Sequence, residues 1–504
     1  MERWLLGVVL VGAAGLRVWR FDLAQVGYDE SLVGSLAHDW AARGAFPLTA
    51  GIVSNTDFRH PPAWTYLMSV VLLPFDTPYA AVALGILVGL VSVVLTWWVG
   101  RRWLGAWGGL AAAAFFGGSF WSLILGRSPW QPAFLAPASL LCLDALLLLA
   151  VKKRAWALPV ACGWLGLMAQ VHYVAAAYTL LVPVAMWPAR RVLRPKHLAA
   201  AVLMGVAPLV PFLVYELHPS VRLHEIGFLA GQAAGGARID LESWDLFWTL
   251  VADGGAAGLG GPSVDGLRSL LGRWSSLGLL GIPLVAGGLV AGALASRWQT
   301  RAWVGWLLLA FVVLPVLALA RHTLGVLFHY LYVDLPGMGL AVGMLAAWAS
   351  AWRWHGRAVG LAVVGGALGV YVAVSAATLL VVLGYLERAD THLGYGTPVR
   401  YSLAAGEAAR SALPVDGRVL VGGRPFDAEV LRFAIGYGVA SRIFDDCQQV
   451  PPGASVYLLM RQSTPGAAGL SAADAPLLAR VERPGDAYLV FGAPVRQPVL
   501  TGQC

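Results

Sequence analysis

Long apolar runs separated by short polar segments make up most of the chain. A helix needs about 20 predominantly apolar residues, in a range of about 17 to 25, to cross a bilayer. Runs near this length are predicted to be membrane spans at residues 4–20, 78–100, 106–125, 132–151, 155–171, 174–189, 197–215, 276–295, 302–320, 327–350 and 358–384. The pattern therefore predicts a mainly α, polytopic membrane domain of eleven helices within residues 1–388.

The basic residues between these runs give the predicted orientation. They form five clusters: Arg101 with Arg102, Lys152 to Arg154, Arg190 to Lys196, Arg297 with Arg301, and Arg353 with Arg357. If the N-terminus is cytoplasmic, every cluster falls on the cytoplasmic side, as the positive-inside rule requires. The same count places the loops 21–77 and 216–275 and the tail 389–504 outside the cytoplasmic membrane.

A further apolar run extends from Pro61 to Pro74. If it crossed the membrane, all the later basic clusters would move to the outer side. We therefore expect it to form a short external helix that is re-entrant or lies on the surface. Two prolines at its start suit a first helical turn, where no backbone donor is lost.

The sequence changes character after residue 388. Short apolar runs at 418–421, 455–459 and 487–491 predict strands, and 427–437 has helical spacing. The tail 389–504 is therefore predicted to be a small α/β domain. It contains Cys447 and Cys504, which form either a disulfide or two free thiols, because sequence spacing does not fix their geometry.

Composition agrees with a membrane protein. Of the 504 residues, 58% are hydrophobic and only 12% are charged, which is too little charge to cover a soluble protein of this size. The net charge of +8 comes mostly from loop arginines. No basic stretch interleaved with aromatic residues occurs in a soluble segment, so no nucleic-acid partner is expected.

The first external loop carries an adjacent acid pair, Asp29 and Glu30, at the start of an amphipathic run that ends near Arg43. Acids are favourable in the first turn of a helix, so helix initiation alone accounts for the pair. Adjacent carboxylates just outside a membrane span are unusual, so a functional role is the second interpretation.

Four further motifs follow on the predicted external side, and their order resembles a known family. They are Arg59-His60-Pro61-Pro62, Arg127-Ser128-Pro129-Trp130-Gln131-Pro132, Gln170-Val171-His172-Tyr173 and His329-Tyr330-Leu331-Tyr332. With the acid pair, they resemble the GT-C membrane glycosyltransferases. The similarity is greatest to the branch that holds glycosyltransferase family 39, the protein O-mannosyltransferases and the aminoarabinose transferases, and it covers roughly residues 1–350.

The resemblance implies transfer of a hexosyl or pentosyl group from a polyprenyl-phosphate donor. The acceptor would be a lipid, glycan or protein at the outer face of the cytoplasmic membrane, and the reaction would invert the sugar without a cofactor. Asp29 matches the catalytic aspartate of the family and would act as base. Glu30 would support it, because consecutive residues on a helix point about 100° apart.

The resemblance and the predicted topology also supply binding candidates. The departing lipid phosphate would be held by a set drawn from Arg59, His60, Arg127, Arg321, His322 and Tyr330. Among these, Arg127 and Arg321 offer the bidentate geometry that phosphate prefers. The alternative for each arginine is a side chain that reaches lipid headgroups.

Four more residues are candidates for binding substrate: Gln131, His172, His224 and Glu225. Packing alone also accounts for His172. Gln131 stands where close relatives carry an acid, which argues against a cationic amino sugar. No obligatory metal is predicted, although Asp57, His60, His224 and Glu225 offer ligand atoms.

Asp144 is the acid that the sequence places inside a membrane span, and intramembrane acids often mark a transport path. A secondary transporter or lipid flippase is therefore the alternative function. The sequence lacks the repeated halves that this alternative predicts. A non-catalytic scaffold is a further alternative, against which the intact acid pair argues.

The predicted topology is testable with a reporter fused after residue 385. A reporter that is active only outside the cytoplasm, such as a secreted phosphatase, is expected to be active, because every basic cluster then lies inside. A fusion active only in the cytoplasm would contradict both the topology and the external position of Asp29.

Overall fold

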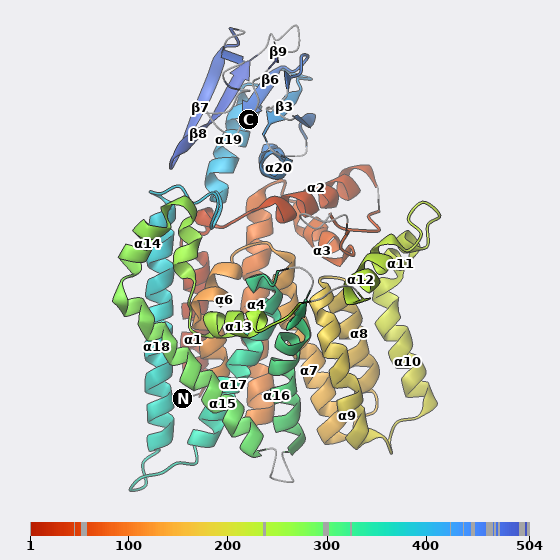
Figure 1. Ribbon diagram of the computed structural model, residues 1–504, viewed down its shortest axis with the longest axis vertical. Helices are drawn as coiled ribbons and strands as arrows, with labels where there is room; N and C mark the ends of the chain where they lie inside the picture. The colour runs from red at the N-terminus through yellow and green to blue at the C-terminus, as the bar shows by residue number, and fades with distance from the viewer. Residues whose placement is uncertain are drawn as a thin grey trace.

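The computed structural model describes residues 2–44, 46–51, 58–234, 238–295, 302–322, 325–423, 425–436, 438–444, 449–459, 467, 470, 471, 474–492, 499 and 500. A helical bundle forms the larger part, and an α/β tail domain stands on one end of it (Figure 1). Cys447, Cys504 and Asp57 lie outside the described residues.

Each of the eleven predicted runs is helical. The bundle helices are α1 (Glu2–Val18), α4 (Pro78–Leu104), α5 (Ala106–Gly118), α6 (Phe120–Leu125), α7 (Leu135–Lys152), α8 (Ala157–Ala169), α9 (Leu181–Ala189), α10 (Pro195–Val206), α11 (Val210–Glu216), α15 (Gly281–Ala295), α16 (Ala302–Leu319), α17 (Leu335–Ala349) and α18 (Val359–Leu386). Within the described residues, seven helical stretches are long and apolar enough to cross a membrane. The other predicted spans are shorter helices, so the count of eleven stays a prediction.

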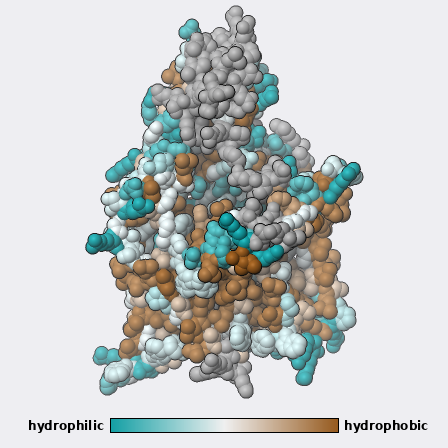
Figure 2. Space-filling model, viewed as in Figure 1, coloured by the Kyte–Doolittle hydropathy of each residue, from teal (hydrophilic) through white to brown (hydrophobic). Residues whose placement is uncertain are grey.

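The outer surface of the bundle is apolar. Figure 2 shows hydrophobic side chains gathered over the bundle and hydrophilic ones over both ends of the molecule. Val202, Leu203 and Val363 are each about two-thirds exposed. Such exposure is unfavourable in water and favourable in lipid, and the fold is that of a multi-pass membrane protein.

Small residues allow the central helices to approach closely. A side-chain carbon at Gly109 of α5 would lie 2.7 Å from the carbonyl oxygen of Trp97 on α4. One at Gly343 of α17 would lie 2.5 Å from the carbonyl oxygen of Gly108. Glycine at these positions is required because the backbones leave no room for a larger residue, as is common between membrane helices.

Two short helices lie between the bundle and the tail domain (Figure 1). They are α2 (Tyr28–Arg43) and α3 (Ala63–Leu72), and α3 is the helix expected from the run 61–74. Trp64 of α3 is 1% exposed, and its Nε1 donates to the carbonyl oxygen of Pro129 at 3.1 Å. This layer therefore rests directly on a motif at the end of the bundle.

The second large loop also packs on the bundle. It contains α12 (His224–Ala234), β1 (Arg238–Ile239), α13 (Glu242–Val251), η5 (Ala256–Ser263), α14 (Val264–Leu271) and η6 (Arg273–Leu280). Asp253 of this loop accepts hydrogen bonds from the backbone N of Phe120, at 3.2 Å, and from the hydroxyl of Ser375. These bonds join the loop to α6 and α18.

The tail domain contains a five-stranded sheet of order β4-β3-β6-β8-β7. Its elements are α19 (Val399–Ser411), β3 (Val419–Gly422), α20 (Pro425–Ile435), β4 (Ser441–Phe444), β6 (Val456–Leu459), β7 (Leu477–Arg483) and β8 (Asp486–Gly492). Strand β3 pairs in parallel with β4 and with the central strand β6, and β8 pairs antiparallel with β6 and β7. The three predicted strands and α20 are confirmed, whereas α19, β4 and β7 were not predicted.

Ion pairs attach the tail domain to the bundle. Arg20 bonds to Glu387 at 2.7 Å and to Asp22 at 3.1 Å, and Arg400 of α19 lies 3.2 Å from Glu387 and 3.3 Å from Asp22. The hydrogen bond from Arg20 lowers the pKa of Glu387 to about 2. A network of two arginines and two acids therefore joins the ends of α1 and α18 to α19.

Asp144, which the sequence analysis singled out as an acid inside a membrane span, is paired with neighbouring side chains. Its carboxylate accepts from Arg102 and from the indole nitrogen of Trp103, each at 2.8 Å. Asp334, at the start of α17, is also buried and accepts from the hydroxyl of Tyr178 at 3.1 Å. Asp144 is thus a paired residue beside a basic cluster, and the span 327–350 contains a second acid.

Candidate functional site

The acid pair begins α2. Glu30 occupies the third helical position, and its Oε2 accepts from the backbone N of Gly27 at 2.9 Å. This reach back to the residue before the helix satisfies a donor that has no partner within the helix. Asp29, in the same first turn, is half-buried.

Glu30 also binds the bundle. Its side chain is 6% exposed, and its Oε1 accepts from the hydroxyl of Ser128 at 3.0 Å. Burial, with a smaller contribution from the charge of Asp29, raises the pKa of Glu30 to about 7. Glu30 therefore holds the helix that carries Asp29 against the segment between α6 and η2 (Gln131–Phe134).

Three histidines from distant segments form a cluster with two tyrosines, which we call the histidine cluster: His60, His172, Tyr173, His329 and Tyr330. The ring centroid of His172 lies 5.6 Å from that of His60, 5.2 Å from that of Tyr330 and 6.1 Å from that of His329. His60 precedes α3, His172 follows α8, and Tyr173 begins η3 (Tyr173–Leu180). His329 and Tyr330 belong to η7 (Phe328–Asp334).

The cluster adjoins the segment that holds Glu30. The ring of Trp130 packs against that of His329 at a tilt, with centroids 4.4 Å apart, and Trp130 lies two residues beyond Ser128. The structure thus brings together the acid pair and the four motifs that the sequence analysis singled out.

The histidines in this cluster are neutral hydrogen-bonding groups. Burial lowers the pKa of His60 to about 4 and lowers that of His172 well below its ordinary value. The Nδ1 of His172 accepts from the backbone N of Val174 at 3.2 Å, which leaves the proton on Nε2. The Nδ1 of His60 is buried without a hydrogen-bond partner among the described residues. A ligand that enters the cluster would meet an available donor and an unpaired nitrogen.

The second loop reaches this region through Glu225, which is 1% exposed. Its Oε2 accepts from the backbone N of Arg59 at 3.0 Å and lies 3.5 Å from Nδ1 of His224. Its Oε1 accepts from the hydroxyl of Tyr215 at 3.3 Å. Glu225 therefore joins the two large loops beside His60.

The predicted phosphate ligands lie in three places, of which the histidine cluster with the adjoining Arg59 is the first. Arg127 is fully buried and donates from Nη2 to the carbonyl oxygen of Arg20, while its Nε and Nη1 have no partner among the described residues. Gln131 is buried nearby in η2. Arg321 and His322 form β2, which pairs with β1, and no described contact joins them to the histidine cluster.

Sequence reasoning missed some of the buried polar groups. Trp130, Tyr173 and His329 stood inside motifs that were noted, but they received no role. Arg17, inside the first predicted span, is fully buried and donates to the carbonyl oxygen of Gly117 at 3.0 Å and to the hydroxyl of Ser122 at 2.8 Å. Its depth depends on the break between α5 and α6, which apolar periodicity does not reveal.

Comparisons with known proteins identify the fold. No protein-family model matches the chain, and no curated protein sequence matches it. ArnT from Cupriavidus metallidurans bound to undecaprenyl phosphate superposes with a TM-score of 0.59 at 16% identity, over 98% of each chain. The apo form of the same protein gives 0.57 at 17% identity, over 97% of this chain and 99% of that one.

A second protein extends the comparison. The apo oligosaccharyltransferase of Archaeoglobus fulgidus superposes with a TM-score of 0.50 at 10% identity, over 86% of this chain and 64% of that one. The chain therefore has the GT-C fold, as the order of its motifs predicted.

The raised pKa of Glu30 makes a prediction about stability. The folded state holds the proton of Glu30 more tightly than the unfolded state does. The protonated side chain therefore contributes its full stabilisation of the folded state below pH 4.5, and this contribution is lost as the pH rises to about 7. Glu30→Gln removes this loss, so its melting temperature should exceed that of the wild type increasingly from pH 4.5 to 7. Thermal unfolding of detergent-purified protein tests this, with Glu407→Gln, at an exposed position of α19, as the control. Parallel wild-type and Glu30→Gln curves would contradict it.

Proposed function

We propose that this GT-C protein is a glycosyltransferase that passes a sugar from a polyprenyl-phosphate donor to a lipid, glycan or protein acceptor at the outer face of the cytoplasmic membrane. The observation that carries the proposal is the convergence of the acid pair with the histidine cluster, linked by Ser128 and Trp130. ArnT, a similar structure that aligns over 98% of each chain, was solved bound to undecaprenyl phosphate, and this supports a polyprenyl-phosphate donor.

Asp29 acts as the base in this proposal. It removes the proton from an acceptor hydroxyl, whose oxygen then forms a bond to the anomeric carbon. The bond from that carbon to the phosphate oxygen breaks, and the electron pair leaves with the lipid phosphate. Attack from the opposite side inverts the sugar. The half-buried position of Asp29 supports this role because a base must stay within reach of an entering acceptor.

The lipid phosphate is bound by Arg59, His60 and Tyr330 in the proposal, with the unpaired donors of Arg127 as further candidates. Neutral histidines suit a hydrogen-bonding role, and Arg59 supplies charge for the leaving group. Gln131 and His172 contact the sugar. His224 and Glu225 shape the wall beside Arg59. Arg321 and His322 are left out of the phosphate site because they are engaged with β1 and its neighbours.

The structure does not favour transport. Asp144 motivated that alternative, and its pairing with Arg102 and Trp103 accounts for it without a transport path.

Asp29→Asn tests the proposal. Asparagine keeps the size and the helix-start position but cannot take a proton, so transfer should fall by ~10²–10⁴-fold. Melting temperature and binding of the polyprenyl-phosphate donor should stay close to those of the wild type. Turnover is measured on purified protein with a polyprenyl-phosphate sugar.

Asp39→Asn is a matched control, because it removes an acid from the same helix three turns from its start. Glu30→Gln should reduce transfer less than Asp29→Asn. Near-normal turnover in Asp29→Asn would show that Asp29 is not the base.

A further inference from the structure

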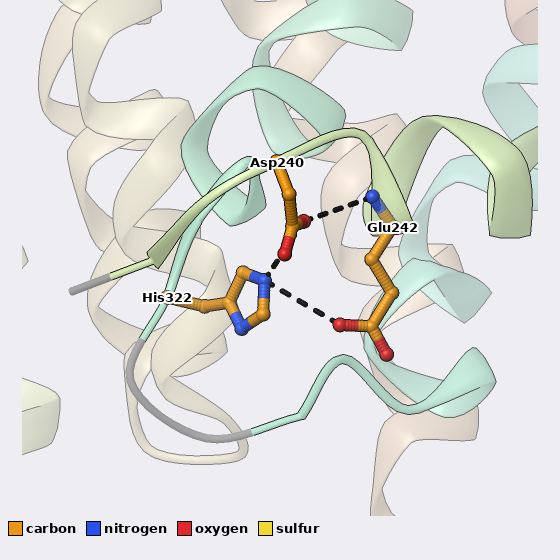
Figure 3. A group of neighbouring side chains, drawn as sticks. All are labelled: Asp240, Glu242 and His322. Carbon is orange, nitrogen blue, oxygen red and sulfur yellow. Dashed lines mark hydrogen bonds and ion pairs between the residues drawn. The ribbon is translucent and has the colours of Figure 1, made fainter.

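Three side chains with metal-binding atoms meet at the junction of the second large loop with the segment after α16 (Figure 3). Asp240 follows β1, Glu242 begins α13, and His322 lies on β2 (Arg321–His322). The Nε2 atom of His322 lies 3.0 Å from Oδ1 of Asp240 and 3.4 Å from Oε2 of Glu242. All three ligand atoms lie within 4.8 Å of one another.

Backbone contacts hold the two segments together. Arg238 pairs with His322 across the two strands, and the backbone N of Asp240 donates to the carbonyl oxygen of Ala320 at 3.1 Å. The hydroxyl of Ser243 donates to the carbonyl oxygen of Val316 at 2.9 Å. The ligand atoms are therefore positioned by the fold, and an ion would not have to gather them from distant loops.

Hydrogen bonding between the three side chains does not satisfy them all. A neutral imidazole carries one N–H, yet two carboxylates approach the same ring nitrogen. The His322 side chain is 7% exposed, whereas those of Asp240 and Glu242 are 40% and 45% exposed. The buried ring thus points outward to two acids that repel one another. A cation between them would accept an electron pair from each ligand atom and offset the repulsion.

The donor set indicates the class of ion. Imidazole nitrogen with carboxylate oxygen suits Zn²⁺ and its first-row neighbours, whereas Ca²⁺ and Mg²⁺ prefer oxygen alone. Ligands at about 2.1 Å around tetrahedral Zn²⁺ lie roughly 3.4 Å from each other, close to the separations from His322. We propose that Asp240, Glu242 and His322 bind one Zn²⁺-class ion, with a water molecule as its fourth ligand.

The ion would have a structural consequence. It would fasten the second large loop to the segment that leads into η7, where His329 and Tyr330 lie. The proposal does not depend on glycosyl transfer, because binding and stability are measured without substrate.

The test uses the full chain with its purification tag removed and its metals extracted with EDTA. Titration calorimetry with ZnCl₂ should show one ion per chain, confirmed by elemental analysis after dialysis. His322→Gln and Glu242→Gln should each weaken binding by at least about tenfold. Zn²⁺ should raise the melting temperature of the wild type more than that of either variant.

His392→Gln is the matched control, because it breaks a His–Asp pair of 2.9 Å elsewhere and should leave zinc affinity unchanged. If a variant loses its melting transition, Asp240→Asn replaces it, since Asp240 is partly exposed and asparagine keeps its shape. Zinc binding that is absent, equal in all variants, or weaker than Mg²⁺ or Ca²⁺ binding would overturn the proposal.

Discussion

Apolar surroundings impose the constraint on which this structure depends. A chain in lipid must satisfy its backbone hydrogen bonds internally, so the apolar runs form helices and the polar chemistry gathers where the helices end. Glycines such as Gly109 and Gly343 bring the central helices close together, which fixes the positions of the segments that emerge from them. Ser128, His172 and His329 all occupy such segments.

The layer of loops and short helices at the end of the bundle depends on a small number of buried polar bonds. Glu30 joins α2 to Ser128, Glu225 joins the two large loops, and Asp253 joins the second loop to α6. Each bond ends on a group that is costly to leave unpaired, so each fixes a loop more firmly than an exposed ion pair would. The two acids of the pair therefore differ in position: Glu30 is buried and holds the helix, and Asp29 is half-buried.

The sequence was informative about elements whose signals are local. Apolar length predicted the bundle, and Pro61 with Pro62 predicted the start of α3. The predicted phosphate set placed His60 and Tyr330 in one region, whereas His172 was a separate candidate for binding substrate. Helix α19 was missed because its residues are weakly apolar, and β7 because its alternation carries charged residues.

Long-range pairings were not predictable in the same way. The pairing of β1 with β2 involves two residues on each side, so no periodicity signals it, and it separates Arg321 and His322 from the histidine cluster. The burial of Arg17 depends on a helix break, and the partners of Asp144 come from another helix. Protonation was also hidden, because the neutral state of His60 follows from burial alone.

The proposed function requires a polyprenyl phosphate to bind at the histidine cluster and Arg59. Photo-crosslinking tests it most directly, with a polyprenyl phosphate that carries a photoreactive group close to the phosphate, followed by peptide mapping. We expect adducts in the segments 58–62, 170–173 and 328–332, which excess unlabelled polyprenyl phosphate suppresses. Competed adducts confined to other segments, such as β2 or the outer faces of the bundle helices, would contradict it.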